Sequence, residues 1–323
     1  MAPYLLLKAI GFFLLVIVGI PGNTFIILQF TYIKSKEKKH VPSNIILSVL
    51  ALANVLVIFS RIIPQSLNAI GVENLLDDIE CKFVIYTYRV SRAMSICVTS
   101  LLSCYQCILI APTTRVWVYL KSKVTKNIMG IIIILWIINF SIYPYCFLST
   151  NAKKNVTNSP YTLHLVYCDS DFLTYTAYIV NGIFYTIRDV IFVGLMTLAS
   201  SYMVFILLSH EKNVKAIRSS NKEQKLSAEI KASRAVILLV VLYVLLFGLD
   251  NSMWVYTLTL SNVPSDMNDI RIFLSSSYAA LSPIVIILTN PKLHRSWILS
   301  NKHKFSQKHT GSTGTVYSVS KYS

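Results

Sequence analysis

The sequence predicts an all-α membrane protein built as a bundle of seven transmembrane helices. The chain of 323 residues is 54% hydrophobic and only 14% charged, a composition unlike that of an ordinary soluble domain. It contains seven apolar runs near or above the length of about 20 residues that crosses the hydrocarbon core as a helix. Its basic residues gather in alternate connections between these runs, which is typical of multi-pass membrane proteins.

The seven runs define one transmembrane domain, residues 1–290, followed by a tail, residues 291–323. They are residues 5–32, 43–63, 83–110, 128–148, 183–208, 235–260 and 271–289. The tail is rich in serine, threonine and lysine, a composition that predicts disorder in the cytoplasm.

The formal net charge of +16 fits nucleic-acid or acidic partners as well as a membrane surface. The positions of the basic residues along the chain decide between these partners. Lysine and arginine crowd the connections after the first, third and fifth runs and the tail, whereas the other connections are mainly acidic. The positive-inside rule then places the amino terminus outside and the carboxyl terminus inside. The charge therefore indicates the cytoplasmic side of the plasma membrane, and we expect a lipid bilayer and no nucleic acid as its partner.

Polar features within the first two runs are expected to serve packing. No separate cleavable signal precedes the first run, so we expect it to insert as a span. Its Pro21-Gly22-Asn23 sequence falls at mid-depth, where proline and glycine are common in membrane helices, and predicts a packing kink. Asn54 in the second run is expected to hydrogen-bond to a neighbouring helix.

Two cysteines lie on the predicted outer side. Cys81 opens the third run and Cys168 lies in the longest outside connection, where disulfides persist, so we expect a bond between them. The same connection contains Asn155-Val156-Thr157, which predicts N-glycosylation of Asn155. The other cysteines are expected to be free, buried thiols: Cys97, Cys104, Cys107 and Cys146.

No cluster of catalytic or metal-binding residues is evident in the predicted spans. All six histidines fall in connections or the tail, away from any nucleophile–base grouping. We therefore expect no metal, no cofactor and no enzymatic activity. The basic connection at residues 209–234 is long enough to extend both flanking helices. It fits either a solvated loop near anionic lipid or a docking surface for a cytoplasmic protein.

Every ionisable residue inside a predicted span lies in its outer half. With a rise of about 1.5 Å per residue, Arg89 lies roughly 12 Å below Cys81, and Arg92 lies one turn deeper. The other such groups are Lys8, Arg61, Arg188, Asp189 and Asp250. A proton or ion pathway needs polar groups near the midplane, whereas a pocket open only to the outside does not. The asymmetry predicts a receptor with an outer cavity.

The third run carries the strongest candidates for ligand contact. Tyr86, Arg89 and Arg92 recur every third residue, which predicts a shared face. The alternative to ligand contact is internal pairing for some of the arginines and snorkelling to the interface for Arg61 and Arg188. We hypothesise that Arg89 or Arg92 binds an anionic or hydrogen-bond-accepting group. Aromatic residues at similar depth are either belt anchors or ligand contacts. The predicted ligand-binding set is Tyr86, Arg89, Arg92, Tyr185, Asp189, Asp250 and Trp254.

Several stretches together resemble vomeronasal type-1 receptors over nearly the whole chain. They are residues 50–71, 78–83, 88–96, 100–112, 188–214 and 232–244, with Ser282-Pro283 in the seventh run and the Asn155 sequon. A fish olfactory class A-related receptor fits the same pattern. The resemblance implies a rhodopsin-like G-protein-coupled receptor that binds pheromone-like small molecules. It also implies coupling to a heterotrimeric G protein of the inhibitory class in chemosensory neurons.

The chain departs from common receptor motifs at three places. Leu109-Ile110-Ala111 stands where other rhodopsin-like receptors have Asp-Arg-Tyr, and Ser282-Pro283 replaces their Asn-Pro sequence. Arg188 stands where the resemblance predicts proline. A bitter-taste receptor, expected to lack the Cys81–Cys168 bond, and a seven-helix transporter, expected to contain internal repeats, are the alternative functions.

Overall fold

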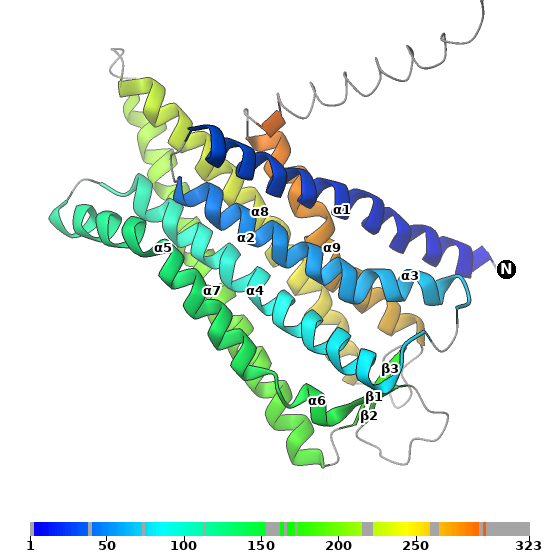
Figure 1. The fold of residues 1–323 in the computed structure, drawn as a ribbon. Helices are drawn as coiled ribbons and strands as arrows, with labels where there is room; N and C mark the ends of the chain where they lie inside the picture. Colours follow the sequence, from blue (N-terminus) through cyan, green and yellow to red (C-terminus); the bar gives the residue numbers. More distant parts are fainter. Residues whose placement is uncertain are drawn as a thin grey trace, which may run out of the picture.

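The computed structural model describes residues 3–37, 41–72, 75–112, 114–152, 162–164, 167–171, 174–214, 222–258, 265–290 and 293–294. Within these ranges, seven helical segments are long and apolar enough to cross a membrane. They lie side by side in one elongated bundle (Figure 1). The predicted fold class is confirmed.

The long helices follow the predicted order of apolar runs, and shorter helices and strands lie within or between them. They are α1 (Pro3–Glu37), α2 (Pro42–Val57), the π-helix η1 (Ile58–Ile62), α3 (Ile63–Ala69), α4 (Asp78–Ile110), α5 (Arg115–Ile142), α6 (Cys146–Ser149), β1 (Thr150–Ala152), β2 (Thr162–His164), β3 (Cys168–Asp171), α7 (Tyr175–Val214), α8 (Lys222–Leu258) and α9 (Ser265–Thr289). Together α2, η1 and α3 form one continuous span, Pro42–Ala69.

Several helices extend past the apolar runs into polar sequence. Helices α7 and α8 reach Val214 and Lys222, so much of the basic connection at residues 209–234 is helical. Helix α5 begins at Arg115, well before the apolar run that starts at residue 128. The reason is that hydrophobicity marks the part of a helix in lipid, while the backbone hydrogen bonds continue into water.

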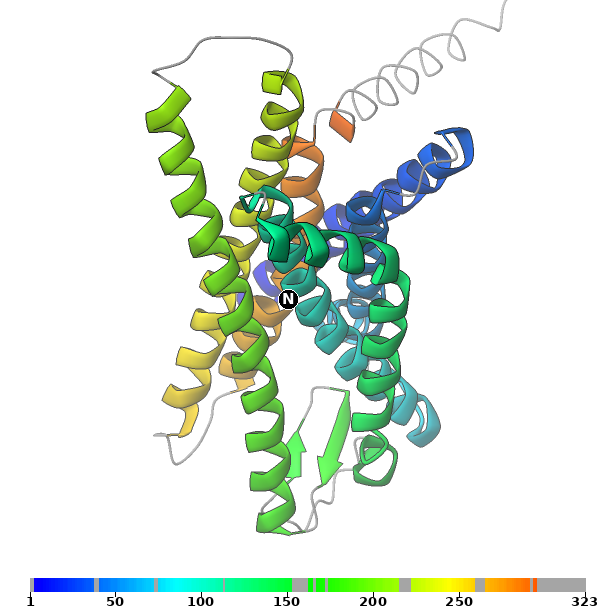
Figure 2. The ribbon, with the colours of Figure 1, turned by 90° about the vertical axis from the view of Figure 1, so that its left-hand side faces the viewer.

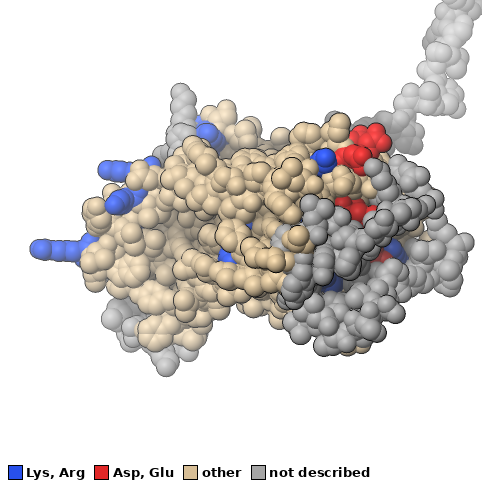
Figure 3. Space-filling view, turned by 90° about the horizontal axis from the view of Figure 1, so that it is seen from below, with Lys and Arg blue, Asp and Glu red and all other residues tan. Residues whose placement is uncertain are grey.

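The two ends of the bundle differ in charge. We call the end that contains the Cys81–Cys168 bond the disulfide end, and the opposite end, with Lys34, Arg115 and Lys121, the basic end. Figure 2 shows the small sheet at one end of the bundle, beside the lower end of the long helix α7. In Figure 3, lysine and arginine side chains project from one extreme of the molecule, and acidic side chains lie toward the other.

Helix α4 occupies the centre of the bundle. In its apolar segment 72% of the residues are buried, against 22% in the corresponding segments of α5 and α7. Many of its buried residues are small, and small residues let membrane helices approach closely. The buried small residues of α4 are Ser91, Ala93, Ser95, Cys97, Thr99, Ser100 and Ser103. Helix α4 therefore contacts helices on several sides and can position side chains toward each of them.

Glycines bring α1 close to α9. Helix α1 continues through Pro21. A Cβ atom added to Gly22 would lie 3.0 Å from the ring of Pro283, and one added to Gly19 would lie 3.0 Å from the Cα of Ala280. The Pro21-Gly22 sequence therefore serves close helix packing, and the kink expected at this place stays a prediction.

Buried asparagines link helices across the bundle. Nδ2 of Asn54 donates to Oγ of Ser282 at 2.9 Å, and Oγ of Ser95 donates to Oδ1 of Asn54 at 2.8 Å. These bonds join α2 to α9 and α4, so the prediction for Asn54 is confirmed. Nδ2 of Asn23 likewise crosses to α9, donating to the carbonyl of Ala279 at 2.9 Å.

Candidate ligand-binding site

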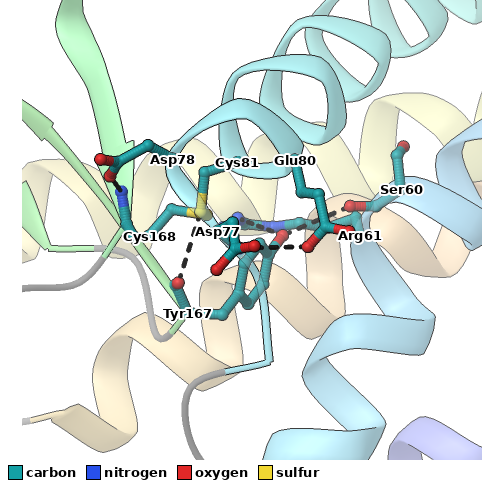
Figure 4. Close-up of a disulfide and its surroundings, with 9 residues drawn as sticks. Ser60, Arg61, Asp77, Asp78, Glu80, Cys81, Tyr167 and Cys168 are labelled. Carbon is teal, nitrogen blue, oxygen red and sulfur yellow. Dashed lines mark hydrogen bonds between the residues drawn. A yellow bond between two sulfur atoms is a disulfide. The ribbon is translucent and has the colours of Figure 1, made fainter.

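The predicted disulfide is present and fixes a small sheet to the start of α4. Cys81 in the first turn of α4 bonds to Cys168, the first residue of β3, with their Cα atoms 5.9 Å apart. The strands are antiparallel in the order β1-β3-β2. A capping box holds the beginning of α4, where the N–H of Asp77 donates to the carboxylate of Glu80 at 3.1 Å (Figure 4).

Tyr167, the neighbour of Cys168, reaches from the loop to the second span (Figure 4). Its hydroxyl accepts a hydrogen bond from Nη1 of Arg61 at 3.1 Å and donates to the carbonyl of Ser60 at 3.4 Å. This carbonyl needs a donor because Pro64, four residues on, has no N–H. Burial raises the pKa of the Tyr167 phenol, although the charge of Arg61 opposes the shift. The phenol is therefore protonated near neutral pH.

The π-helix η1 carries Arg61 into the bundle. A π-turn contains an extra residue, which changes the face on which the residues after it lie. Arg61 is only 6% exposed, so it does not snorkel to the interface, and that explanation is wrong for this residue. Its guanidinium stands over the rings of Tyr88 and Tyr167, 5.0 and 5.7 Å from their centroids.

A cavity of about 250 Å³ opens at the disulfide end. Helices α4, α7, α8 and α9 and the segment η1 all contribute to it, together with Tyr143 beyond the end of α5. Its lining residues are Arg61, Ile85, Tyr88, Arg89, Arg92, Tyr143, Tyr185, Arg188, Asp189, Asp250, Arg271, Ile272 and Ser275. Five arginines and two aspartates thus face one small space, and the wall carries an excess of positive charge.

Two carboxylates pair with three of these arginines. Asp250 lies 3.2 Å from Nη2 of Arg92 and 3.7 Å from Nε of Arg271. Asp189 accepts from Nε of its neighbour Arg188 at 3.0 Å. Arg188 also donates to the hydroxyl of Tyr143. Internal pairing therefore accounts for part of the charge, as expected.

The remaining two guanidinium groups contact aromatic rings. Arg89 stands over Tyr185, 5.2 Å from the ring centroid, and Arg61 stands over Tyr88 and Tyr167 as described above. Within the described parts of the chain, no carboxylate forms an ion pair with either arginine. Cation–π contacts stabilise a guanidinium by about 0.5–2 kcal/mol and leave its charge in place. Both groups retain the capacity to bind an anion.

Comparison with known proteins identifies the kind of receptor that carries this cavity. The sequence pattern of the vomeronasal organ pheromone receptor family matches residues 7–299. The chain belongs to this family. Membership agrees with the seven spans, the Cys81–Cys168 disulfide and the resemblance found in the sequence.

Individual relatives are similar over most of their length. The vomeronasal-type chain is 36% identical over 306 residues to "Olfactory receptor class A-like protein 1" of Danio rerio, covering 94% of this chain and 96% of that protein. It is 35% identical over 235 residues to "Vomeronasal type-1 receptor 3" of Homo sapiens, covering 72% and 76%. It is 29% identical over 287 residues to "Vomeronasal type-1 receptor 90" of Rattus norvegicus, covering 88% and 91%.

The cavity of this vomeronasal-type receptor brings together five of the seven predicted ligand-binding residues. They are Arg89, Arg92, Tyr185, Asp189 and Asp250. Tyr86 lies elsewhere in the described structure: its hydroxyl donates to the carbonyl of Phe140 at 2.9 Å, and its ring packs on Phe140 and Phe147. The side chain of Trp254 and the sequon at Asn155 lie outside the described residues.

Sequence reasoning missed several lining residues of the receptor cavity. Arg271 is the first residue of the seventh predicted run and was not among the predicted site residues, yet its side chain reaches Asp250. Tyr88 and Tyr143 carry no charge, and nothing in their sequence surroundings distinguishes them from anchors at the membrane interface. Snorkelling was the explanation offered for Arg188 from the sequence, and the structure instead pairs it with Asp189 in the cavity wall. Knowledge of which helices are neighbours was needed to find all four.

A smaller cavity of about 20 Å³ continues from the same place toward the centre of the receptor, enough for about one water molecule. It shares Arg92, Asp250 and Ser275 with the larger cavity and reaches Tyr278. The hydroxyl of Tyr278 lies 2.9 Å from that of Thr99. Polar groups thus extend from the larger cavity to the buried part of α4.

Three of the four remaining cysteines are free and buried as expected, and the fourth is free but only half-buried. Cys97, Cys107 and Cys146 are free and buried, and Cys104 is free and half-buried. Among the residues that the structure describes, no group of three or more histidine, cysteine or acidic side chains is arranged to hold a metal ion.

Proposed function

We propose that this vomeronasal-type receptor is a chemosensory receptor that binds an anionic small molecule in the cavity at its disulfide end. The observation that carries the proposal is the wall of five guanidinium groups and two carboxylates. Taking charged groups out of water is costly unless a partner of opposite sign is present. Guanidinium groups bind carboxylates and sulfates through paired hydrogen bonds. An anionic ligand would supply the missing negative charge.

The cavity favours a small ligand. Its volume of about 250 Å³ lies at or below the lower end of the range for small-molecule sites, about 300–1,000 Å³. Tyr88, Tyr143, Tyr185 and two isoleucines supply apolar surface beside the charged groups. We infer a pheromone-like or odorant molecule with a compact apolar part and an acidic group.

The proposed orientation places the disulfide end outside the cell and the basic end in the cytoplasm of a chemosensory neuron. A disulfide is stable on the oxidising side of the membrane. The lysines and arginines near the basic end follow the positive-inside rule. The amino terminus is then outside, the carboxyl terminus inside, and the sequon at Asn155 lies in the glycosylated compartment.

Signalling is proposed to proceed by a shift between two populations of the receptor. A ligand favours the state to which it binds more tightly. Binding between α4, α7 and α8 would favour the state in which the basic ends of α7 and α8 separate. The helical extensions of α7 and α8 to Val214 and Lys222 offer a docking surface for a heterotrimeric G protein. By resemblance to vomeronasal receptors we assign the inhibitory class, and the mechanism needs no catalytic step.

The alternatives are less well supported. A bitter-taste receptor was expected to lack the outer disulfide, which is present. A transporter is unsupported because the pattern of the pheromone receptor family covers residues 7–299.

Acid and amide pairs test the proposal directly. Cells that express the receptor and an inhibitory G protein would be exposed to octanoate, benzoate and cyclohexanecarboxylate, and to the amide of each. We expect responses to acids and weaker or no responses to amides. Arg89→Gln should raise the effective concentration of an active acid about tenfold or more, since hydrogen bonds to charged groups contribute about 1.5–3 kcal/mol.

A matched control separates binding from general electrostatic attraction. Lys82→Gln removes one positive charge next to Cys81, and Lys82 does not line the cavity. This variant should respond like the wild type. Equal responses to acids and amides, or unchanged responses in both Arg89→Gln and Arg92→Gln, would refute the proposal.

A further inference from the structure

Arg61 is the buried cation whose partners leave its charge unmatched. Arg61 is 6% exposed and lines the cavity. Its Nε atom makes no hydrogen bond within the described structure. Its recorded polar partner is the neutral phenol of Tyr167, 3.1 Å away. An ionised group in such surroundings is costly to bury unless a negative charge approaches it.

The position of Arg61 is set by three separate features. The π-helix η1 directs it inward, the ring of Tyr88 supports one side of it, and Tyr167 is held in place by the adjacent Cys81–Cys168 bond. A side chain held on several sides loses little further conformational freedom when it binds a ligand. Arg61 is therefore preorganised for a ligand group in the cavity.

Arg61 and Arg89 occupy different walls of the cavity. Arg61 stands over Tyr88, and Arg89, the next residue of α4, stands over Tyr185 of α7. Consecutive residues of a helix point about 100° apart. The second span and α7 both pack on α4, so these two unpaired guanidinium groups approach the cavity from two sides of that helix.

We propose that Arg61 is a second anion-binding residue and that the cavity accepts a small molecule with two acidic groups, one at Arg61 and one at Arg89. This inference rests on the proposed function, because it assumes that an acid binds here at all. It specifies the ligand class further: a diacid should bind better than a molecule of the same length with a single acidic group. Arg92, Arg188 and Arg271 have carboxylate partners and are not needed for this recognition.

The test compares diacids with their half-amides. Succinate, adipate, suberate and sebacate, each with its half-amide, would be applied to cells that express the wild type, Arg61→Gln, Arg61→Lys, Arg89→Gln or the control Lys82→Gln. Receptor at the cell surface would be measured in parallel. We expect at least one diacid to act at a lower concentration than its half-amide on the wild type.

Arg61→Gln should remove this preference. The effective concentration of the diacid should rise about tenfold to a hundredfold, while that of the half-amide, held through Arg89, should change little. Arg61→Lys keeps the charge without the planar fork and should show a smaller loss of the same kind. If Arg61→Gln fails to reach the cell surface, the diacid preference of Arg61→Lys tests the role of Arg61 instead.

Three results would overturn the inference. The wild type could show no preference for any diacid over its half-amide, or the preference could persist in the Arg61 variants. The Arg61 variants could also weaken both compounds equally, as a purely structural role predicts. If monoacids still require Arg89 in these cases, the proposed function stands and the second anion site fails. If acids have no effect and amides activate, the proposed function itself fails.

Discussion

Asp250 of α8 lies between two guanidinium groups, 3.2 Å from Nη2 of Arg92 on α4 and 3.7 Å from Nε of Arg271 on α9. One carboxylate therefore connects three spans at the cavity. The side chain of Asp250 is 9% exposed, and those of Arg92 and Arg271 are 28% and 26% exposed. Loss of the shared carboxylate should lower the stability of the folded receptor more than loss of one of its two arginine partners.

Asp250→Asn should lower stability more than Arg92→Gln does. The first change removes the carboxylate that lies between Arg92 and Arg271, whereas the second leaves Asp250 with Arg271. We expect about 2 kcal/mol for Asp250→Asn and about half of that for Arg92→Gln, between the values for exposed and buried pairs. Thermal unfolding of the purified receptor in detergent measures both. A loss in Arg92→Gln as large as that in Asp250→Asn would contradict the shared arrangement.

Cys81→Ser and Cys168→Ser should each reduce stability by about 2–4 kcal/mol, the usual loss for a native disulfide. The double variant should be no worse than either single variant, because all three lack the same bond. Surface expression and thermal unfolding measure the effect. Cys104→Ser is the matched control, since Cys104 is free and half-buried, and it should behave like the wild type. Additive losses in the double variant would show that the two thiols act separately.

Asn54→Ala should destabilise the bundle about twice as much as Ser282→Ala. Asn54 bonds to both Ser282 and Ser95, and an interhelical hydrogen bond in a membrane protein contributes about 0.6 kcal/mol. Ser282→Ala removes one of these bonds. Thermal unfolding of the two variants and of their combination tests the relationship. An equal or larger loss in Ser282→Ala would contradict it.

Gly19→Ala should destabilise the packing of α1 against its neighbours. The new Cβ atom would lie 2.5 Å from Cδ1 of Ile58 and 3.0 Å from the Cα of Ala280. Since backbone cannot move aside as a side-chain end can, we expect a loss of about 1–3 kcal/mol. Gly130→Ala is the control: no atom lies within 4 Å of a Cβ added there, and alanine favours a helix. Stability that falls equally in both variants would refute this interpretation.

The sequence predicted the spans and their chemistry because membranes impose simple rules. The apolar runs had to be helices, and Cys81 and Cys168 were the two cysteines predicted to lie on the oxidising side. Asn54 needed a hydrogen-bond partner in a nonpolar surrounding, and the structure provides two. These conclusions depend on local composition and depth alone.

Contacts between distant segments could not be predicted in the same way. The spacing of Tyr86, Arg89 and Arg92 predicts one shared face, but each step of three residues falls about 60° short of a full turn. Over two steps Tyr86 therefore turns away from Arg92, and it packs on Phe140 instead. The inward position of Arg61 depends on a π-turn, for which the sequence gives only the nearby Pro64 as a signal.

The link from Cys168 through Tyr167 to Arg61 has a practical consequence for handling the receptor. A reductant that opens the bond also releases the tyrosine that positions a cavity arginine. A thiol additive in an assay buffer would then mimic an antagonist while much of the lipid-embedded bundle remained intact. Screens for activating odorants should therefore be run in oxidising medium.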